Sequence, residues 1–394
     1  MPRNAKVAYG NFLFVGYVIS CLALAAGGRP SVSLTFASLL FVSIFFVPTK
    51  LPFQLSAPMR FVVFLLVSSL VLGGISIEQE RWGALTTLLL VLLMARLRRI
   101  WPKSLILRVV TLALVCTVAA SLALGIFFPE IGIVQTGYEA GSLTGFFTHR
   151  NLLGMVAGAT STLLIAGYQA KNLSAFFTFG GLLFSLPALV MSRSMSSIFA
   201  FVIALVATQI WFRGKREEKS KQKINFRGTT VLLLVAIAMV TFFYLPGPFQ
   251  LIGRDETLTG RTQIWSVLIS KSDQFWLWGV GWDRAWTELD PVSSQIRADL
   301  GFFVAHAHSA VLDMIYRLGL PAILVVTIVS ILNWRSFKLP KGQLAKTQDK
   351  NFTKIVVIFL VALGTSESFL HLNWFPLVLL TLLPAKEQDQ SAKP

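Results

Sequence analysis

The sequence contains little charge and almost no cysteine. Only 13% of its 394 residues are charged, whereas soluble globular domains carry roughly 25%. Hydrophobic residues make up 55% of the chain, which indicates a multi-span membrane protein and excludes an ordinary soluble enzyme. The two cysteines, Cys21 and Cys116, both lie inside apolar runs, so the sequence predicts neither a disulfide framework nor a cysteine metal site.

Acidic residues are also scarce. The chain has 18 acidic and 35 basic residues, for a formal net charge of +17. The basic residues gather in short loops between apolar runs, which is the pattern of cytoplasmic loops beside anionic lipid. We therefore expect a lipid bilayer, and no nucleic acid, as the partner of this charge.

Apolar runs, most of them long enough to cross a bilayer at about 20 residues each, recur along the chain. They predict an all-α integral membrane fold with about twelve transmembrane helices. Arg3 and Lys6 precede the first run as in a signal peptide, but further runs follow directly, so we interpret it as an uncleaved first helix. The predicted spans are residues 11–28, 32–48, 61–77, 82–95, 105–128, 151–169, 173–191, 195–212, 229–245, 310–332, 355–371 and 373–384.

Three basic loops set the predicted orientation. They lie at 96–103, 213–227 and 335–354, and all three face the cytoplasm if both termini are inside. The same topology puts one large loop, 246–309, on the outside. The predicted organisation is therefore nine spans in 1–245, an extracytoplasmic loop at 246–309, and three spans with a cytoplasmic tail in 310–394.

Two histidines close the large loop, just before the apolar run resumes at Ala310. Histidine can act as a general base near neutral pH, because its ordinary pKa is about 6.5. His308 is the candidate base, and an interfacial histidine that caps a helix is the alternative. An isolated His306-x-His308 pair lacks further ligands at a recognisable spacing, so we predict no metal site.

Arginines at the outer face are candidates for binding a phosphate group, because guanidinium bonds phosphate in a bidentate manner. Arg193 lies between two apolar runs, and Arg261 and Arg254 lie in the large loop. Trp265 follows Arg261 by four residues, so in a helix the two would share one face. Each arginine could alternatively snorkel to the membrane interface.

Arg317 lies about two turns into the tenth predicted span, deeper than snorkelling comfortably allows. Asp313, one turn earlier, could pair with it, and so could Glu367 in the eleventh span. We interpret Arg317 as one member of an ion pair with a structural role.

Three polar residues, His149, Arg150 and Asn151, stand at the outer end of the sixth predicted span. A helix N-terminus presents unpaired N–H groups and the positive end of the helix dipole. This end is therefore a candidate phosphate site, and an ordinary helix boundary is the alternative.

Four short motifs, in this order, resemble the O-antigen ligase and polysaccharide polymerase superfamily, and most closely its exopolysaccharide polymerase branch. Residues 145–154 read GFFTHRNLLG and are similar to that branch's Gly-x-Phe-x-His/Asn-Lys-Asn-x-x-Gly. The others are GRTQIW at 260–265, WGVGW at 278–282, and AHS at 307–309 followed by LGL at 318–320. Arg150 stands where the branch has lysine, and Ser309 where it has asparagine.

The resemblance implies a GT-C-type glycosyltransferase of the bacterial cytoplasmic membrane, with its catalytic loop on the extracytoplasmic side. Its donor would be a glycan on a polyprenyl diphosphate, its acceptor a second glycan, and no metal or other cofactor would be needed. His308 would be the base, and Arg193 and Arg261 would hold the diphosphate. The predicted substrate contacts are His149, Arg150, Asn151, Trp265, His306 and Arg254.

Several functions remain open at this point. Polymerisation of lipid-linked repeats is favoured by the His149-Arg150-Asn151 segment, and transfer to lipid A core or to a protein is the alternative. A polysaccharide transporter or flippase would also suit about twelve helices, but it predicts repeated halves, and the sequence has no convincing repeat. Envelope polysaccharide-assembly proteins are candidate partners, and a non-catalytic scaffold for an export complex is a further reading.

Overall fold

The computed structural model describes residues 103–137, 139–213, 260–281, 284–321, 323–324, 344–365 and 367–368. Within these ranges the elements are helices, and one isolated β-bridge joins Ile133 to Leu143. The predicted spans before residue 103, the spans 229–245 and 373–384, and Arg254 lie outside the described residues. The helices are α5 (Lys103–Phe127), α6 (Pro129–Gly132), α7 (Arg150–Gln169), α8 (Ala175–Met191), α9 (Met195–Arg213), α12 (Arg261–Ser270), η3 (Ser272–Gln274), α13 (Pro291–Leu300), α14 (Ala310–Leu318) and α16 (Leu344–Gly364).

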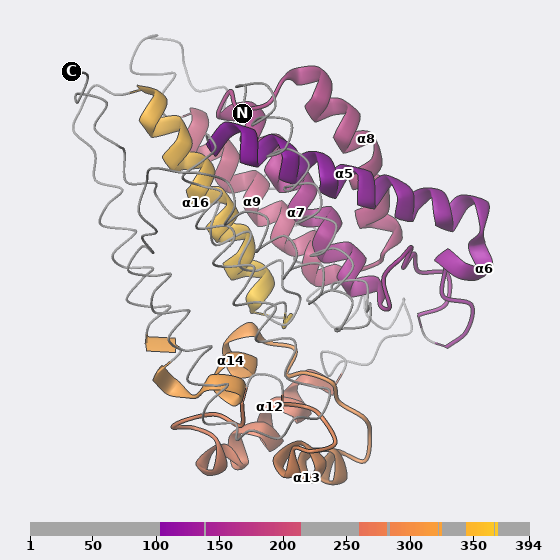
Figure 1. The fold of residues 1–394 in the computed structure, drawn as a ribbon, viewed down its shortest axis with the longest axis vertical. Coiled ribbons are helices and arrows are strands. Elements are labelled where there is room, and N and C mark those ends of the chain that lie inside the picture. The colour runs from indigo at the N-terminus through magenta and orange to yellow at the C-terminus, as the bar shows by residue number, and fades with distance from the viewer. Residues whose placement is uncertain are drawn as a thin grey trace, which may run out of the picture.

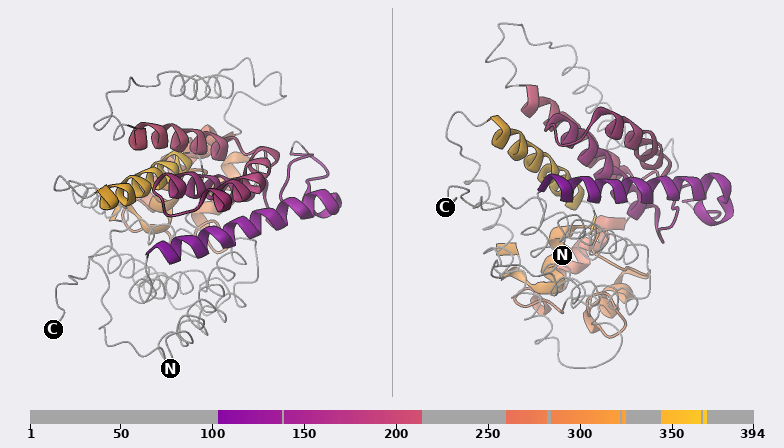
Figure 2. Two further views of the ribbon diagram at one scale, coloured as in Figure 1. Left: turned by 90° about the horizontal axis from the view of Figure 1, so that it is seen from above. Right: turned by 45° about the horizontal axis from the view of Figure 1, so that its top comes forward.

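Five long helices, α5, α7, α8, α9 and α16, form a bundle in which α7 contacts each of the other four (Figures 1 and 2). Small residues line much of α7 and are buried, among them Gly154, Ala157, Gly158 and Ala159. Small side chains let helix backbones approach closely, which is the usual way that helices associate in a membrane. The sequence of α7 therefore suits the centre of a membrane bundle.

Four predicted spans correspond to helices of the structure. Those at 105–128, 151–169, 173–191 and 195–212 match α5, α7, α8 and α9 to within two residues at each end. Residues 107–127 of α5 and all of α7 are long and apolar enough to cross a membrane, and α8, α9 and α16 contain shorter apolar stretches. The all-helical, membrane-type fold is supported, and the count of about twelve spans stays a prediction.

The tenth predicted span, 310–332, was wrong as one continuous helix. Its helix α14 ends at Leu318, because Gly319 adopts a positive φ of 75°. The Gly319 backbone packs against the carbonyl group of Leu277, and a Cβ at this position would collide with it. Hydrogen bonds fix the same contact, with the Leu320 N–H donating to the Trp276 carbonyl at 2.8 Å.

The eleventh predicted span, 355–371, has different ends in the structure. Helix α16 begins at Leu344 and ends at Gly364. The Thr365 hydroxyl donates back to the Ala362 carbonyl at 2.8 Å and closes the last turn. Glu367 therefore lies beyond the helix, and its side chain can turn toward neighbouring elements.

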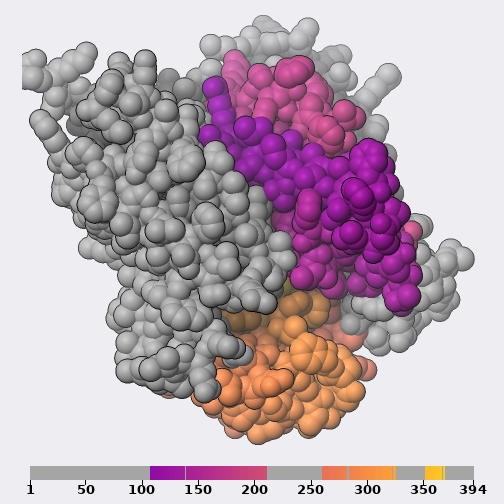
Figure 3. Space-filling view, turned by 45° about the vertical axis from the view of Figure 1, so that its right-hand side comes forward, coloured from indigo at the N-terminus to yellow at the C-terminus, as the bar shows by residue number. Residues whose placement is uncertain are grey.

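A smaller lobe, the cap (residues 260–318), lies at one end of the bundle (Figure 3). It holds α12, η3, α13 and α14 around a core that includes Tyr316, whose ring centroid is 4.6 Å from that of Trp286 and 4.8 Å from that of Phe275. Asp290 is buried in this core, where its carboxylate caps α13 through the Val292 N–H at 3.0 Å and also accepts from Tyr316. The cap is thus a packed unit and not only a connecting loop.

Gly154 offers a test of the close packing between α7 and the turn that joins α8 to α9. A Cβ at this position would meet the Ser194 Cβ and lie 2.9 Å from the Ser192 hydroxyl oxygen. Overpacking of this kind costs about 1–3 kcal/mol, so Gly154→Ala should lower the melting temperature of the purified protein in detergent. Gly180→Ala is the matched control, because a Cβ there meets nothing within 4 Å. Equal melting temperatures for the two variants would contradict the packing argument.

Candidate active site

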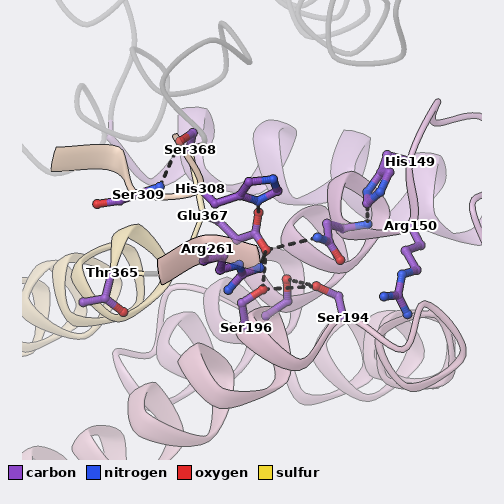
Figure 4. Close-up of polar contacts among 12 residues, drawn as sticks. His149, Arg150, Ser194, Ser196, Arg261, His308, Ser309, Thr365, Glu367 and Ser368 are labelled. Carbon is purple, nitrogen blue, oxygen red and sulfur yellow. Dashed lines mark hydrogen bonds and ion pairs between the residues drawn. The ribbon is translucent and has the colours of Figure 1, made fainter. Parts of the chain in front are cut away.

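Glu367 joins three helices through one oxygen atom. It is buried, at 2% exposure. Its Oε1 accepts hydrogen bonds from Asn151 Nδ2 at 3.1 Å, Ser196 Oγ at 2.7 Å and Arg261 Nη2 at 2.8 Å (Figure 4). These donors begin α7, α9 and α12. One carboxylate thus ties the bundle to the helix of the cap that carries Arg261.

His308 lies on the other oxygen of the same carboxylate. Its Nδ1 is 3.9 Å from Glu367 Oε2, which is within ion-pair range but too long for a hydrogen bond (Figure 4). The His308 backbone has a φ of 50°, in the left-handed region. The next residue, Ser309, donates its N–H to the Ser368 hydroxyl at 3.1 Å. We call Asn151, Ser196, Arg261, His308 and Glu367 the Glu367 cluster.

Two nitrogen atoms of this cluster are buried without a hydrogen-bond partner among the described residues. They are Arg261 Nε and His308 Nδ1. Buried polar groups are nearly always paired in native proteins, and an exception calls for an explanation. Unsatisfied nitrogens on a cation and on an imidazole are consistent with a site that binds a polar ligand.

The charge of Glu367 is maintained by its neighbours. Burial raises the pKa of this carboxyl, but the adjacent His308, the positive charge of Arg261 and the hydroxyl of Ser196 outweigh it and hold the pKa well below its usual range. A buried ion pair such as Arg261–Glu367 is costly to break, because the remaining partner is left without compensation. The carboxylate therefore holds the Arg261 guanidinium at this place in the structure.

Serine hydroxyls support the carboxylate from the turn that joins α8 to α9 and from the first turn of α9. Ser194 and Ser197 are hydrogen-bonded at 2.9 Å, and Ser194 lies 3.5 Å from Ser196, which bonds Glu367. All three serines are buried. They orient the Glu367 oxygen without adding a further charge.

A second group of charged residues lies at the start of α7. His149 caps the helix, since its Nδ1 accepts the Asn151 N–H at 3.1 Å, and this leaves Nε2, 3.4 Å from Glu139, as the protonated nitrogen. Arg150 is buried and its Nε pairs with Glu139 at 2.7 Å. Burial raises the pKa of Glu139, but His149 and Arg150 outweigh it and lower the pKa to about 2.

Arg193 belongs to this second group and not to the Glu367 cluster. Its backbone carbonyl accepts from Arg150 Nη1 at 3.3 Å. Its guanidinium turns to the 133–149 loop, where Nη1 donates to the Ala140 carbonyl at 3.1 Å and passes close to Gly141. The structure thus brings Arg261 and His308 together, and it places the Arg193 side chain beside a different loop.

Two further predicted site residues, His306 and Trp265, lie close to His308. The ring centroid of His306 is 4.0 Å from that of His308. Trp265 donates its indole N–H to the Ala307 carbonyl at 2.8 Å. Within the described ranges no set of three or more His, Cys, Asp or Glu side chains could hold a metal ion.

The role of Glu367 was not predicted from the sequence. Its signal was an acid inside an apolar run, and we expected it only as one of two partners for Arg317. The pairing of Arg317 with Asp313 is confirmed, with Nε 2.7 Å from the carboxylate. Glu367 instead forms its ion pair with Arg261. Ser196 and Glu139 were also missed, because neither stands in a recognisable motif.

The middle of the chain is similar to a known protein family. A search of curated proteins finds no match. Residues 180–327 match the family model described as O-antigen ligase. Three members of the Glu367 cluster, Ser196, Arg261 and His308, fall in the matched part, and Asn151 and Glu367 lie outside it. The part of the chain that carries the arginine and the histidine of the cluster is therefore similar to the O-antigen ligase family, whose members are multi-pass membrane proteins of lipid-linked glycan transfer.

Proposed function

We propose that the protein is an inverting membrane glycosyltransferase that moves a glycan from a polyprenyl diphosphate carrier to a hydroxyl group of an acceptor glycan. The observation that carries this proposal is the arrangement of Arg261 and His308 on the two oxygens of Glu367. A cation for a leaving diphosphate and a base for an attacking hydroxyl are the two groups that this reaction needs.

The reaction follows from these two groups. His308 accepts the proton of the acceptor hydroxyl as its oxygen forms a bond to the anomeric carbon of the donor. The bond between that carbon and the diphosphate oxygen breaks, and polyprenyl diphosphate leaves with the electron pair. Arg261 stabilises the negative charge that grows on the diphosphate. Attack opposite the leaving group inverts the anomeric carbon.

Glu367 has two roles in this proposal. It compensates the positive charge of Arg261 before the donor binds. It also faces His308 Nδ1, so that it would stabilise the imidazolium formed when His308 takes the proton. The carboxylate beside the histidine of a Ser-His-Asp triad acts in the same way. Glu367 thus acts through Arg261 and His308, and we assign it as a positioning residue.

Arg193 is proposed as the second cation for the diphosphate, on the resemblance given above. Arg193 is exposed, and among the described residues its guanidinium donates to one backbone carbonyl, that of Ala140. This bond would exchange for a bidentate contact with phosphate when the donor binds. His149, Arg150 and Asn151, which stand together at the start of α7, would then contact the substrate.

Two candidate activities differ in the molecule that accepts the glycan. We propose polymerisation of lipid-linked repeats into a surface polysaccharide at the outer face of the bacterial cytoplasmic membrane, on the His149-Arg150-Asn151 segment. Transfer to lipid A core or to a protein is the second candidate, because the family model that matches residues 180–327 is described as O-antigen ligase.

The experiment uses purified protein in lipid nanodiscs with isolated polyprenyl-diphosphate-linked repeats, a chelator, and neither ATP nor an ion gradient. A ladder of longer lipid-linked glycans supports the polymerase. A single addition that requires lipid A core supports the ligase. Unchanged donor with either acceptor, together with movement of labelled donor across liposome membranes, would contradict both and favour a transporter.

A further inference from the structure

Trp265 connects the helix of Arg261 to the segment of His308. It lies four residues after Arg261 in α12, and its indole N–H donates to the Ala307 carbonyl at 2.8 Å. Ala307 is fully buried and directly precedes His308. A single hydrogen bond therefore reaches from the helix of the cation to the peptide group next to the base.

The His308 segment needs such support. A non-glycine residue at positive φ is strained and persists only where the surroundings hold it. The residues on both sides of His308 donate backbone hydrogen bonds, the Ala307 N–H to Asp313 Oδ1 at 3.3 Å and the Ser309 N–H to Ser368 Oγ at 3.1 Å. Trp265 adds the bond to the Ala307 carbonyl, and of these partners it is the one that comes from α12.

The position of the Trp265 indole favours support of the His308 backbone over stacking on a sugar ring. Trp265 packs against the buried core of the cap, beside residues such as Ile264 and Leu268 of its own helix. Its polar N–H is already used within the protein. We propose that Trp265 is a positioning residue that fixes the backbone of His308 relative to Arg261, and this inference rests on the proposed function.

The proposed reaction explains why the distance between His308 and Arg261 must be fixed. Base and leaving-group cation act on opposite sides of one anomeric carbon, and a misplacement of about 1 Å can cost on the order of 100-fold in rate. One turn of α12, a rise of about 6 Å over four residues, sets the spacing between Arg261 and the bond to Ala307. Helix α12 thus carries the cation, and through Trp265 it also holds the peptide group that precedes the base.

Trp265→Phe separates positioning from sugar stacking, because phenylalanine keeps a flat ring and lacks the N–H. Positioning predicts that kcat for glycan transfer falls about tenfold, the value of one lost hydrogen bond of about 1.4 kcal/mol, while KM for the donor changes little. Stacking predicts that Trp265→Phe keeps its kcat and that Trp265→Ala raises KM. A wild-type kcat in the folded Phe variant would overturn the proposal.

A measurement that does not depend on glycan transfer distinguishes a failure of the positioning role from a failure of the proposed function. Amide hydrogen exchange over residues 303–310 should accelerate in Trp265→Phe, because the Ala307 carbonyl loses its donor. Ser266→Ala is the matched control, since Ser266 is exposed on the same helix and its hydroxyl bonds the Gln263 carbonyl. Exchange that is unchanged in the Phe variant would overturn the positioning role, whether or not the wild-type protein transfers glycan. A wild-type protein without transfer activity would instead contradict the proposed function.

Discussion

Replacing His308 with alanine is expected to abolish glycan transfer while the protein still folds and inserts into the membrane. A positioned general base contributes about 10²–10⁴-fold to the rate, and the side chain is partly exposed, so that its removal leaves no large cavity. The measurement is the rate of transfer by purified protein from a polyprenyl-diphosphate-linked donor, compared with the wild type at equal protein concentration.

A second variant protects this prediction against a folding defect. The His308 backbone lies at positive φ, and asparagine is among the residues that tolerate this region best. His308→Asn should therefore keep the local backbone and still lack a base. If the Asn variant melts like the wild type and transfers glycan at a comparable rate, His308 is not the base.

Replacing Glu367 with alanine is expected to have the largest combined effect on folding and activity. It removes the acceptor of Asn151, Ser196 and Arg261 and leaves the Arg261 guanidinium, whose side chain is 16% exposed, without its counter-charge. Breaking a buried ion pair from one side costs about 3–5 kcal/mol. The melting temperature in detergent should fall, and transfer should be lost.

The double variant Glu367→Ala with Arg261→Ala separates these two effects. Removing both charges relieves the uncompensated guanidinium, so the double variant should be more stable than Glu367→Ala alone. Transfer should stay absent, because the diphosphate then lacks its cation. A double variant that is as unstable as the sum of the two single variants would show that the pair contributes no coupling energy.

Four of the five bundle helices, α5, α7, α8 and α9, could be predicted from the sequence because nearby residues determine where they begin and end. Helix α8 begins after Ser174, whose hydroxyl accepts the Phe177 N–H, and α7 begins after His149 in the same way. Apolar runs of sufficient length between such ends leave little choice in a membrane. These spans were therefore predicted to within two residues.

The C-terminal ends of α14 and α16 could not be predicted, because apolar residues continue past both of them. Gly319 ends α14 through its contact with the Leu277 backbone, 42 residues earlier in the chain. Neither a hydropathy pattern nor a single glycine indicates that contact. Glycine alone is tolerated within membrane helices, so it does not by itself mark an end.

Several residues of the candidate site could be predicted from the sequence, but the contacts between them could not. Motif positions identified Asn151, Arg261 and His308, and the structure brings all three to Glu367. Asn151 and Glu367 are separated by 216 residues, and an acid in a membrane segment indicates only that some partner exists. The direction of the Arg193 side chain likewise depends on the fold of the 133–149 loop.

In the proposed reaction Arg261 binds the diphosphate and His308 acts on the acceptor at the same cluster. The most direct measurement is the affinity of purified protein in nanodiscs for polyprenyl diphosphate, made on the wild type, His308→Ala and the Glu367→Ala/Arg261→Ala double variant. We predict that His308→Ala binds like the wild type, although it does not transfer glycan, and that the double variant binds at least about tenfold more weakly. Wild-type affinity in the folded double variant would contradict the account.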